Sequence, residues 1–334
     1  MISQRYAEAN DPRMCDTYDP TKPTQTLLYM DANSLYPTAM CMPLPIDQFS
    51  MVPDPDSFNV MEVADDAEYG YILEIDGFTP SGKHDLFNDY PLTPEKLRIY
   101  REKLSRFQKD NFPPGKGTEK LIPHLDSLVK YVIHYHNLKL YTSLGFIVTK
   151  IHRVIRFRQG PWLRSFMELN IDQRREAARI GDKARVGTTK LAMNAVFGKT
   201  MENVRTHVNI ELLTSSKFAQ KRIAKPNFTR SKRFHDNLLG VQLTRTNVEL
   251  TKPIQSGFAI LELAKAHMID GYYNTWLQHF PRSSLLFTDT DSFCVAVEHP
   301  DVYAEMATFK DWFDFSEYPQ DHTLYDDTNS KVNS

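Results

Sequence analysis

Cysteine is scarce in this 334-residue sequence, and long apolar runs are absent. The three cysteines, Cys15, Cys41 and Cys294, are far apart and form no Cys-x-x-Cys pair. Such spacing excludes a disulfide scaffold and a structural zinc site, and favours a reducing compartment. No run of about 18 apolar residues occurs, and the first residues lack the basic and apolar segments of a signal peptide. We therefore expect an intracellular protein that is neither secreted nor membrane-spanning.

The charge is nearly balanced overall but uneven along the chain. Lys and Arg number 40 and Asp and Glu 42, which gives a net charge of −2. Residues 151–250 hold 20 basic and 8 acidic side chains, a net +12, whereas the rest holds 20 basic and 34 acidic ones. A basic middle between acidic flanks favours one face that meets a polyanion and carboxylates elsewhere that hold cations. A solvated helical surface is the alternative.

Apolar periodicity predicts a mixture of strands and helices without internal repeats. Strands are expected at residues 26–30, 71–75, 284–287 and 292–297. Helices are expected at residues 94–107, 183–202 and 257–277, with another that has Pro161 as its first helical residue. Two basic helices joined near Gly181 would form an antiparallel hairpin.

Three aspartates end apolar strands. Asp289 and Asp291 stand at the tip of the expected hairpin, where a β geometry would point both carboxylates to one side. Asp31 follows the apolar run 26–30 and would also lie at a sheet end. Aspartates are ordinary turn residues, so the Asp-x-Asp pair alone is weak support. Together, the three carboxylates favour Mg²⁺, which binds oxygen ligands and substrate phosphates.

Phosphate-binding groups accompany these acids. The residues after Asp31 would supply successive backbone N–H groups from a turn that enters a helix. Lys190, in the basic hairpin, would bring positive charge to the same phosphates, although a lone helix lysine is usually a solvated one. Carboxylates, a phosphate cradle and a cationic helix together favour phosphoryl or nucleotidyl transfer with two metal ions.

Three segments carry a resemblance to a known family. Residues 31–37 (DANSLYP), 190–198 (KLAMNAVFG) and 288–292 (TDTDS) resemble motifs A, B and C of family B DNA polymerases, in order and in spacing. Other segments are similar to the protein-primed branch of viruses and mobile elements: residues 136–141 (HNLKLY), 150–153 (KIHR), 198–205 (GKTMENVR), 252–254 (KPI) and 257–261 (GFAIL). The resemblance covers nearly the whole chain.

The resemblance implies an α+β polymerase palm, in which helices pack on an antiparallel sheet, with a helical fingers hairpin and two insertions. It divides the chain into residues 1–41 with motif A, 42–160 as an insertion of the type that contacts a priming protein, 161–203 as the fingers with motif B, 204–250 as a second insertion, and 251–334 with motif C. The implied activity is DNA-directed DNA synthesis during replication of a viral or mobile element. The implied partners are template-primer DNA, dNTPs and a terminal priming protein.

The resemblance also implies roles for single residues. Asp31, Asp291 and the Ala32 carbonyl would bind two Mg²⁺ ions, with Mn²⁺ as a substitute, and Asp289 would support the site. The backbone N–H groups of Ser34, Leu35 and Tyr36 would hold the triphosphate, and the Tyr36 ring would exclude a 2′-hydroxyl. Lys190, Asn194 and either Arg174 or Arg175 would complete the nucleotide site.

The sequence departs from the family pattern in several places. Ala195 and Phe197 replace a serine and a tyrosine, and Gly187 lies where relatives carry bulky apolar residues. No proofreading motif precedes Asp31 and no Lys-x-Tyr motif follows motif C, so an exonuclease and a thumb are expected to be missing. A catalytically silent nucleic-acid-binding remnant is the alternative. A glycosyltransferase that uses Asp289 and Asp291 would leave Asp31 and motif B unexplained.

Overall fold

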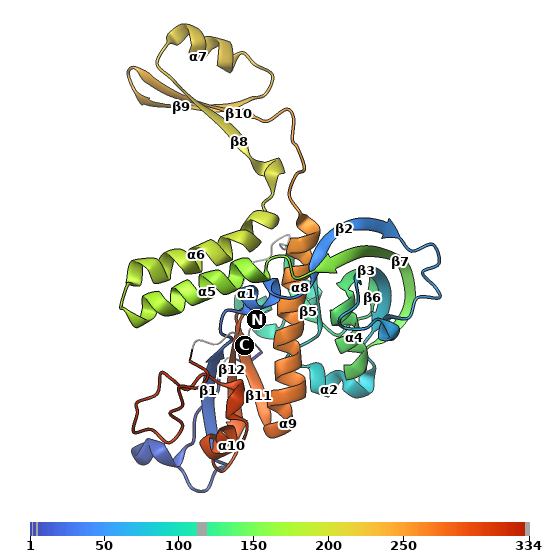
Figure 1. The fold of residues 1–334 in the computed structure, drawn as a ribbon, viewed down its shortest axis with the longest axis vertical. Coiled ribbons are helices and arrows are strands. Elements are labelled where there is room, and N and C mark those ends of the chain that lie inside the picture. The colour runs from blue at the N-terminus through green and yellow to red at the C-terminus, as the bar shows by residue number, and fades with distance from the viewer. Residues whose placement is uncertain (2, 5, 112–118, 331–334) are drawn as a thin grey trace. The chain divides into compact units, whose positions relative to one another are not determined.

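Two compact units make up the computed structural model, which describes residues 1, 3–4, 6–111 and 119–330. The main unit comprises Met1–Met193 and Ala259–Ser334, and the insertion unit comprises Asn194–Phe258. The chain leaves the main unit within helix α6 (Lys183–Thr200) and returns within helix α8 (Ile254–Asp270) (Figure 1). Over the described ranges, no helix has both the length and the apolar character needed to cross a bilayer.

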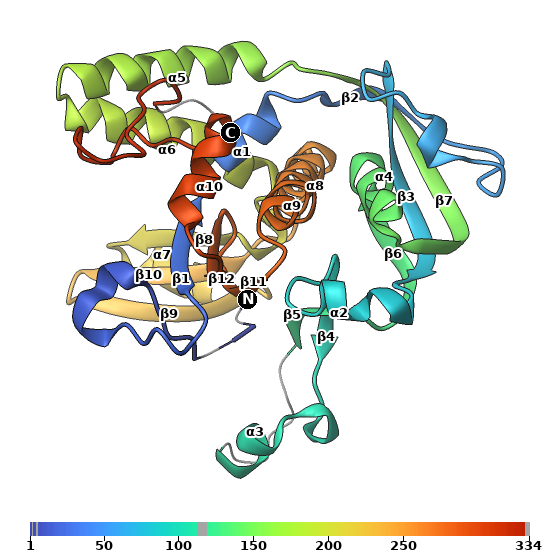
Figure 2. The same ribbon diagram turned by 90° about the horizontal axis from the view of Figure 1, so that it is seen from below.

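A small antiparallel sheet carries motifs A and C. Its strands are β1 (Gln25–Asp31), β12 (Ser292–Glu298) and β11 (Ser283–Thr288), in that order, and they lie side by side in both views (Figures 1 and 2). Asp31 pairs with Ser292, so the end of β1 meets the start of β12. Leu285 and Val295 are fully buried on the core side. These strands, with helices packed around them, confirm the predicted α+β class.

A second, larger antiparallel sheet has the order β2-β7-β3-β6. Its strands are β2 (Leu44–Met51), β7 (Ile147–Gly160), β3 (Tyr69–Phe78) and β6 (Leu128–His134). Helix α4 (Tyr135–Leu144) follows β6 directly, and it ends at Gly145, whose φ of 106° is left-handed. Glycine takes that conformation without the steric cost that a Cβ would add.

The helix predicted over residues 94–107 is wrong. Residues Thr93–Arg98 form strand β4, which pairs with β5 (Glu119–His124), and the Glu95 carboxylate lies 3.0 Å from His124 Nε2. The partner strand lies more than twenty residues later in the chain, so local propensity did not reveal it. A helix, α3 (Arg106–Asn111), begins only at the end of the predicted range.

The basic hairpin consists of α5 (Arg164–Arg179) and α6, joined at Gly181, whose φ is 73°. The two helices lie side by side in both views (Figures 1 and 2). Helix α5 starts three residues later than predicted, because the chain makes a turn after Pro161 in which Arg164 N donates to the Pro161 carbonyl at 3.1 Å. Helix α6 passes unbroken through Gly187.

Helix α8 supports the small sheet in the main unit. It continues through a π-helical turn (Gly271–Trp276) into α9 (Leu277–His279), and the buried side chains of Tyr272, Tyr273 and Trp276 join the main core. Shorter helices of this unit are α1 (Leu35–Met40), α2 (His84–Phe87) and α10 (Val302–Thr308). The core thus includes strands β11 and β12 and the π-helical turn.

The insertion unit is a small sheet with one helix. Strands β8 (Val208–Leu213), β10 (Leu238–Thr244) and β9 (Phe228–His235) lie in that order, and helix α7 (Ser216–Ile223) connects β8 to β9. Val241 and Leu243 of the central strand are buried, whereas β9 is exposed along nearly its whole length. The unit contains 11 Lys and Arg residues and 4 Asp and Glu residues.

Candidate active site

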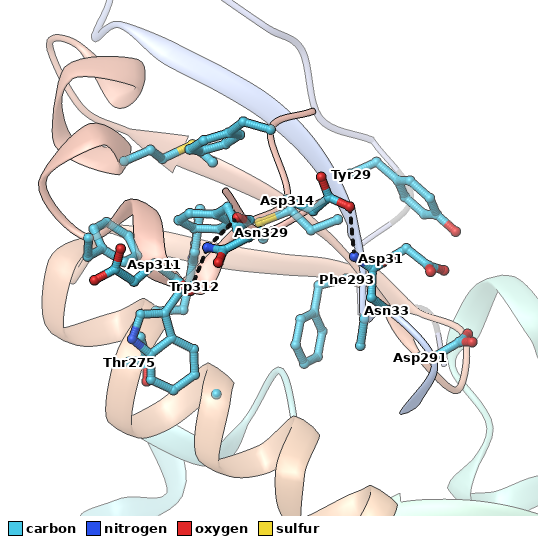
Figure 3. A pocket seen from close by; sticks show the side chains of 18 of the residues that line it. Tyr29, Asp31, Asn33, Thr275, Asp291, Phe293, Asp311, Trp312, Asp314 and Asn329 are labelled. Carbon is cyan, nitrogen blue, oxygen red and sulfur yellow. Dashed lines mark hydrogen bonds between the residues drawn. The ribbon is translucent and has the colours of Figure 1, made fainter. Parts of the chain in front are cut away.

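The end of β1 and the turn between β11 and β12 form the centre of the site. Ala32 N donates to the Asp291 carbonyl at 2.6 Å, which continues the β1–β12 pairing past Asp31. Figure 3 shows Asp31 and Asp291 on adjoining segments. Two acids far apart in the sequence are thereby brought together by main-chain hydrogen bonds.

The electrostatics of Asp31 reflect this proximity. Partial burial raises the pKa of the Asp31 carboxyl above its ordinary value, and the negative charge of Asp291 raises it further. Lys190, which is exposed on α6, acts in the opposite direction and lowers the pKa of Asp31. Asp291 and Lys190 therefore both act on the Asp31 carboxyl through space.

Asp289 lies at the exposed tip of the turn. Asp291 N donates to the Asp289 carbonyl at 2.7 Å, and Thr290 between them has a φ of 59°. The three residues lie outside the strands, so the β geometry expected for Asp289 and Asp291 is wrong. A left-handed residue reverses the chain and breaks the alternation of side chains that a strand would impose.

A second left-handed residue follows Asp31. Ser34 precedes α1 with φ 56° and ψ 41°, a conformation that costs a non-glycine residue roughly 1 kcal/mol or more. Leu35 is buried, and Tyr36 is half-buried. Burial raises the pKa of the Tyr36 hydroxyl, and the charge of Asp291 adds to this effect. Tyr36 is thus another neighbour of the acids.

Helix α5 brings one of the two candidate arginines to this turn. Arg174 Nη1 donates to Ser34 Oγ at 3.5 Å. Arg175 is exposed and lies 3.7 Å from Asp172 Oδ1 on its own helix. Asn194, also exposed, is the first residue of the insertion unit. Of the predicted residues, the structure therefore brings Asp31, Asp291, Ser34, Tyr36, Lys190 and Arg174 together.

A cavity of about 580 Å³ opens beside the acids in the main unit (Figure 3). Strand β1, helix α8 with its π-helical turn, and the segment after α10 form its walls. Aromatic rings make up much of the lining, including Phe293, Phe309, Trp312 and Phe313, and Asp31 and Asp291 lie at its edge. The acids therefore border a space large enough for a ligand.

A comparison with known protein families shows the family to which this chain belongs. The family model of DNA polymerase type B, organellar and viral, matches residues 14–271. The chain belongs to this family. The match includes motifs A and B, whereas motif C lies beyond residue 271.

Solved structures of phi29 DNA polymerase are similar to this polymerase-family chain. One, in an orthorhombic crystal form, is 15% identical with a TM-score of 0.48 and is matched over 84% of this chain and 40% of its own. Another, with primer-template DNA and incoming nucleotides, is 17% identical with a TM-score of 0.44. It is matched over 84% of this chain and 41% of its own. This chain thus spans about two fifths of the phi29 chains. No curated protein gives a significant sequence match.

Asp31 and Asp291 can also be compared with the ligand requirements of Mg²⁺. Within the described ranges, no group of three or more His, Cys, Asp or Glu side chains is arranged to hold a metal ion. Mg²⁺ keeps several waters and needs only one or two carboxylates when substrate phosphates supply further ligands. Asp31 and Asp291, whose segments are joined by the hydrogen bond from Ala32 N to the Asp291 carbonyl, can supply these carboxylates.

The sequence did not reveal two features of this candidate site. Tyr29 is 61% exposed, and its ring lies 5.9 Å from that of Phe287. Its position two residues before Asp31 was the available signal, because alternate residues of a strand share a face. Asp314 contacts Asn33 of motif A, and no pattern in the acidic C-terminal segment indicated this.

Proposed function

We propose that this chain contains the palm and fingers of a template-directed DNA polymerase. It transfers a nucleotidyl group from a dNTP to a primer 3′-hydroxyl or to the hydroxyl of a priming protein. The hydroxyl oxygen bonds to the α-phosphorus while the bond to pyrophosphate breaks. The observation that carries the proposal is the main-chain pairing that joins Asp31 to Ser292 and Ala32 to Asp291 in a member of the type B family.

Asp31 and Asp291 are the proposed ligands of two Mg²⁺ ions, which Mn²⁺ can replace, and the Ala32 carbonyl completes the ligand set. When bound, such ions stabilise negative charge on the attacking and leaving oxygens. Burial and the charge of Asp291 both raise the pKa of Asp31, and a bound cation would offset both effects. Asp289, at the tip of the turn, supports the conformation of Asp291.

The turn after Asp31 is the proposed binding site for the triphosphate. Backbone N–H groups of Ser34, Leu35 and Tyr36 would donate to phosphate oxygens. Arg174 and Lys190 contribute positive charge, and the Arg174 contact with Ser34 favours it over Arg175 as the arginine of the site. The Tyr36 ring lies beneath the sugar, and Asn194 lines the pocket of the new base pair.

The proposed macromolecular partner is template-primer DNA. The basic residues 151–250 supply charges that would follow its phosphates. The solved phi29 polymerases include complexes with primer-template DNA and with incoming nucleotides, which supports the same ligands here. The insertions, residues 42–160 and 204–250, are proposed to contact a priming protein and to assist strand displacement.

Primer extension tests the proposal. The full chain, a primed template of defined sequence and Mg²⁺ should yield products whose sequence follows the template. Asp31→Asn and Asp291→Asn serve as controls, and binding of labelled DNA is measured for all three proteins. DNA binding without incorporation by the unaltered chain would contradict polymerase activity and favour the silent remnant.

A further inference from the structure

A hydrogen bond joins motif A to the C-terminal segment of the main unit. Asn33 Nδ2 donates to Asp314 Oδ2 at 3.2 Å, across 281 residues of sequence (Figure 3). Asn33 lies between Asp31 and the left-handed Ser34. The contact therefore reaches the turn that carries a proposed metal ligand and the start of the proposed triphosphate site.

Asp314 is itself held firmly. Its Oδ1 accepts hydrogen bonds from Ser316 N at 3.0 Å and from Ser316 Oγ at 2.5 Å. The neighbouring rings of Phe313 and Phe315 are stacked with centroids 5.1 Å apart, and Phe315 is buried in the main core. The carboxylate of Asp314 is therefore a fixed acceptor.

The side-chain amide of Asn329 donates further hydrogen bonds that hold the loop around Asp314. Asn329 Nδ2 lies 3.1 Å from the carbonyl oxygens of Asp311 and Phe313 (Figure 3). Lys310 Nζ and Asp326 Oδ2 form an ion pair of 2.6 Å beside it. The C-terminal segment thus presents Asp314 from a loop that is tied at several points.

The turn that Asp314 contacts, residues 31–34, contains a strained residue. Ser34 is in a costly backbone conformation, and Asn33 directly precedes it. A turn with such strain keeps its shape only where surrounding contacts hold it. The Asn33 side chain supplies one such contact from inside the turn.

We propose that Asp314 is a positioning residue that acts through Asn33. Asp314 holds the Asn33 amide, and the amide holds the turn from Asp31 to Ser34 in the conformation that presents Asp31 beside Asp291. The proposal rests on the proposed function for its catalytic consequence. It also makes a separate statement about cation binding, because a displaced Asp31 carboxylate would bind a divalent cation less tightly.

A double-mutant cycle separates this role from a general contribution of Asp314 to folding. Mn²⁺ alone is the probe, titrated by electron paramagnetic resonance into the full chain and into Asn33→Ala, Asp314→Ala and the double variant. Each single change should weaken the affinity for Mn²⁺ by about tenfold, and the double variant should be no weaker than either single. Asp31→Asn removes a carboxylate of the proposed metal site. Weaker Mn²⁺ binding in this variant shows that the titration measures binding at that site.

Two further variants act as controls. Asp321→Ala removes an exposed acid of the same segment and should leave Mn²⁺ binding unchanged. Asp314→Asn keeps an oxygen acceptor for Asn33, so it should bind Mn²⁺ more tightly than Asp314→Ala does. If Asp314→Ala does not fold, Asp314→Leu, which also removes the carboxylate acceptor, takes its place in the cycle.

Three outcomes would overturn the inference. They are unchanged Mn²⁺ affinity in Asn33→Ala, additive losses in the double variant, and the absence of Asp31-dependent Mn²⁺ binding in the unaltered chain. Primer extension tests the proposed function separately, because the Mn²⁺ titration reads the position of Asp31 without requiring turnover. An inactive chain that shows the expected cycle would contradict the proposed function and support the positioning role.

Discussion

The amide nitrogen of Ala32 lies 2.6 Å from the carbonyl oxygen of Asp291. The two proposed metal-binding segments are thus joined by the main chain rather than by side chains. Because this hydrogen bond does not involve either carboxylate, changing a carboxylate to an amide should leave the junction intact. Substitutions at Asp31 and Asp291 can therefore test chemistry without disturbing the sheet.

Asp291→Asn should lower nucleotide incorporation by about 10³-fold, because an ion held by one carboxylate fewer stabilises the transition state by several kcal/mol less. Single-turnover primer extension measures the rate, and circular dichroism checks the fold. The loss should be similar for every dNTP. Near-normal rates in a folded Asp291→Asn protein would contradict the role of this acid.

Asp31→Asn should stabilise the metal-free protein near neutral pH. The pKa of Asp31 is raised in the folded state, so between its ordinary and raised values the folded protein binds more protons than the unfolded one. The contribution of Asp31 to stability consequently falls as pH rises through this window. Thermal unfolding in chelator at several pH values should show the gain from Asp31→Asn disappear toward acidic pH. A gain that is independent of pH would argue against this origin.

Tyr36→Ala should relax discrimination against ribonucleotides. If the ring lies beneath the incoming sugar, its removal leaves room for a 2′-hydroxyl and does not alter the acids. The ratio of kcat/KM for dNTP to that for rNTP should fall by at least about tenfold, equivalent to roughly 1.4 kcal/mol. Tyr29→Ala removes another tyrosine near the acids and provides the comparison. An unchanged ratio in active Tyr36→Ala protein would refute the assignment.

Arg174→Ala and Arg175→Ala should have different effects on the KM for dNTP, although the two residues are adjacent in the sequence. Loss of a charged hydrogen bond to phosphate costs about 1.5–3 kcal/mol, so Arg174→Ala should raise the KM for dNTP by roughly 10- to 100-fold. Arg175→Ala should change it less, because Arg175 is exposed and forms an ion pair with Asp172 of its own helix. Steady-state kinetics with each dNTP decide the matter, and equal effects would remove the distinction.

DNA affinity should fall log-linearly with salt concentration, with a slope of about −0.7 to −0.9 for each phosphate bound. Replacing Lys221 and Lys232 of the insertion unit by alanine should make the slope shallower by about one unit for each phosphate that the variant no longer binds. Lys22→Ala, in the acidic N-terminal part, is the matched control. Binding that does not depend on salt would favour a solvated role for the basic residues.

The sequence was sufficient to predict elements whose signals are local. The run 26–30, the hairpin around Asp289 and the helices beside Gly181 each carry apolar periodicity or a turn residue in a short window, and the structure contains them. The order of motifs A and C then indicated which strand ends should meet. The pairing of Asp31 with Ser292 follows that expectation.

Structural features that depend on contacts between residues distant in the sequence could not be predicted from these local patterns. Strand β4 is a strand only because β5 pairs with it, and its own residues resemble the start of a helix. The Asn33–Asp314 contact needs the C-terminal loop to fold back on motif A, which no periodicity encodes. The left-handed conformations of Ser34 and Thr290 also arise in residues that usually avoid them.

The pairing of β1 with β12 has a consequence for the time course of synthesis. The insertion unit draws all its strands from one continuous stretch, so it can fold as soon as that stretch has left the ribosome. Strand β1 leaves the ribosome long before its partner β12, which ends only at Glu298. The nascent chain must therefore carry an unpaired β1, with Leu28 and Met30 not yet packed on the core, while hundreds of later residues are added. Chaperone binding to the unpaired strand would then be a natural part of the synthesis of this protein.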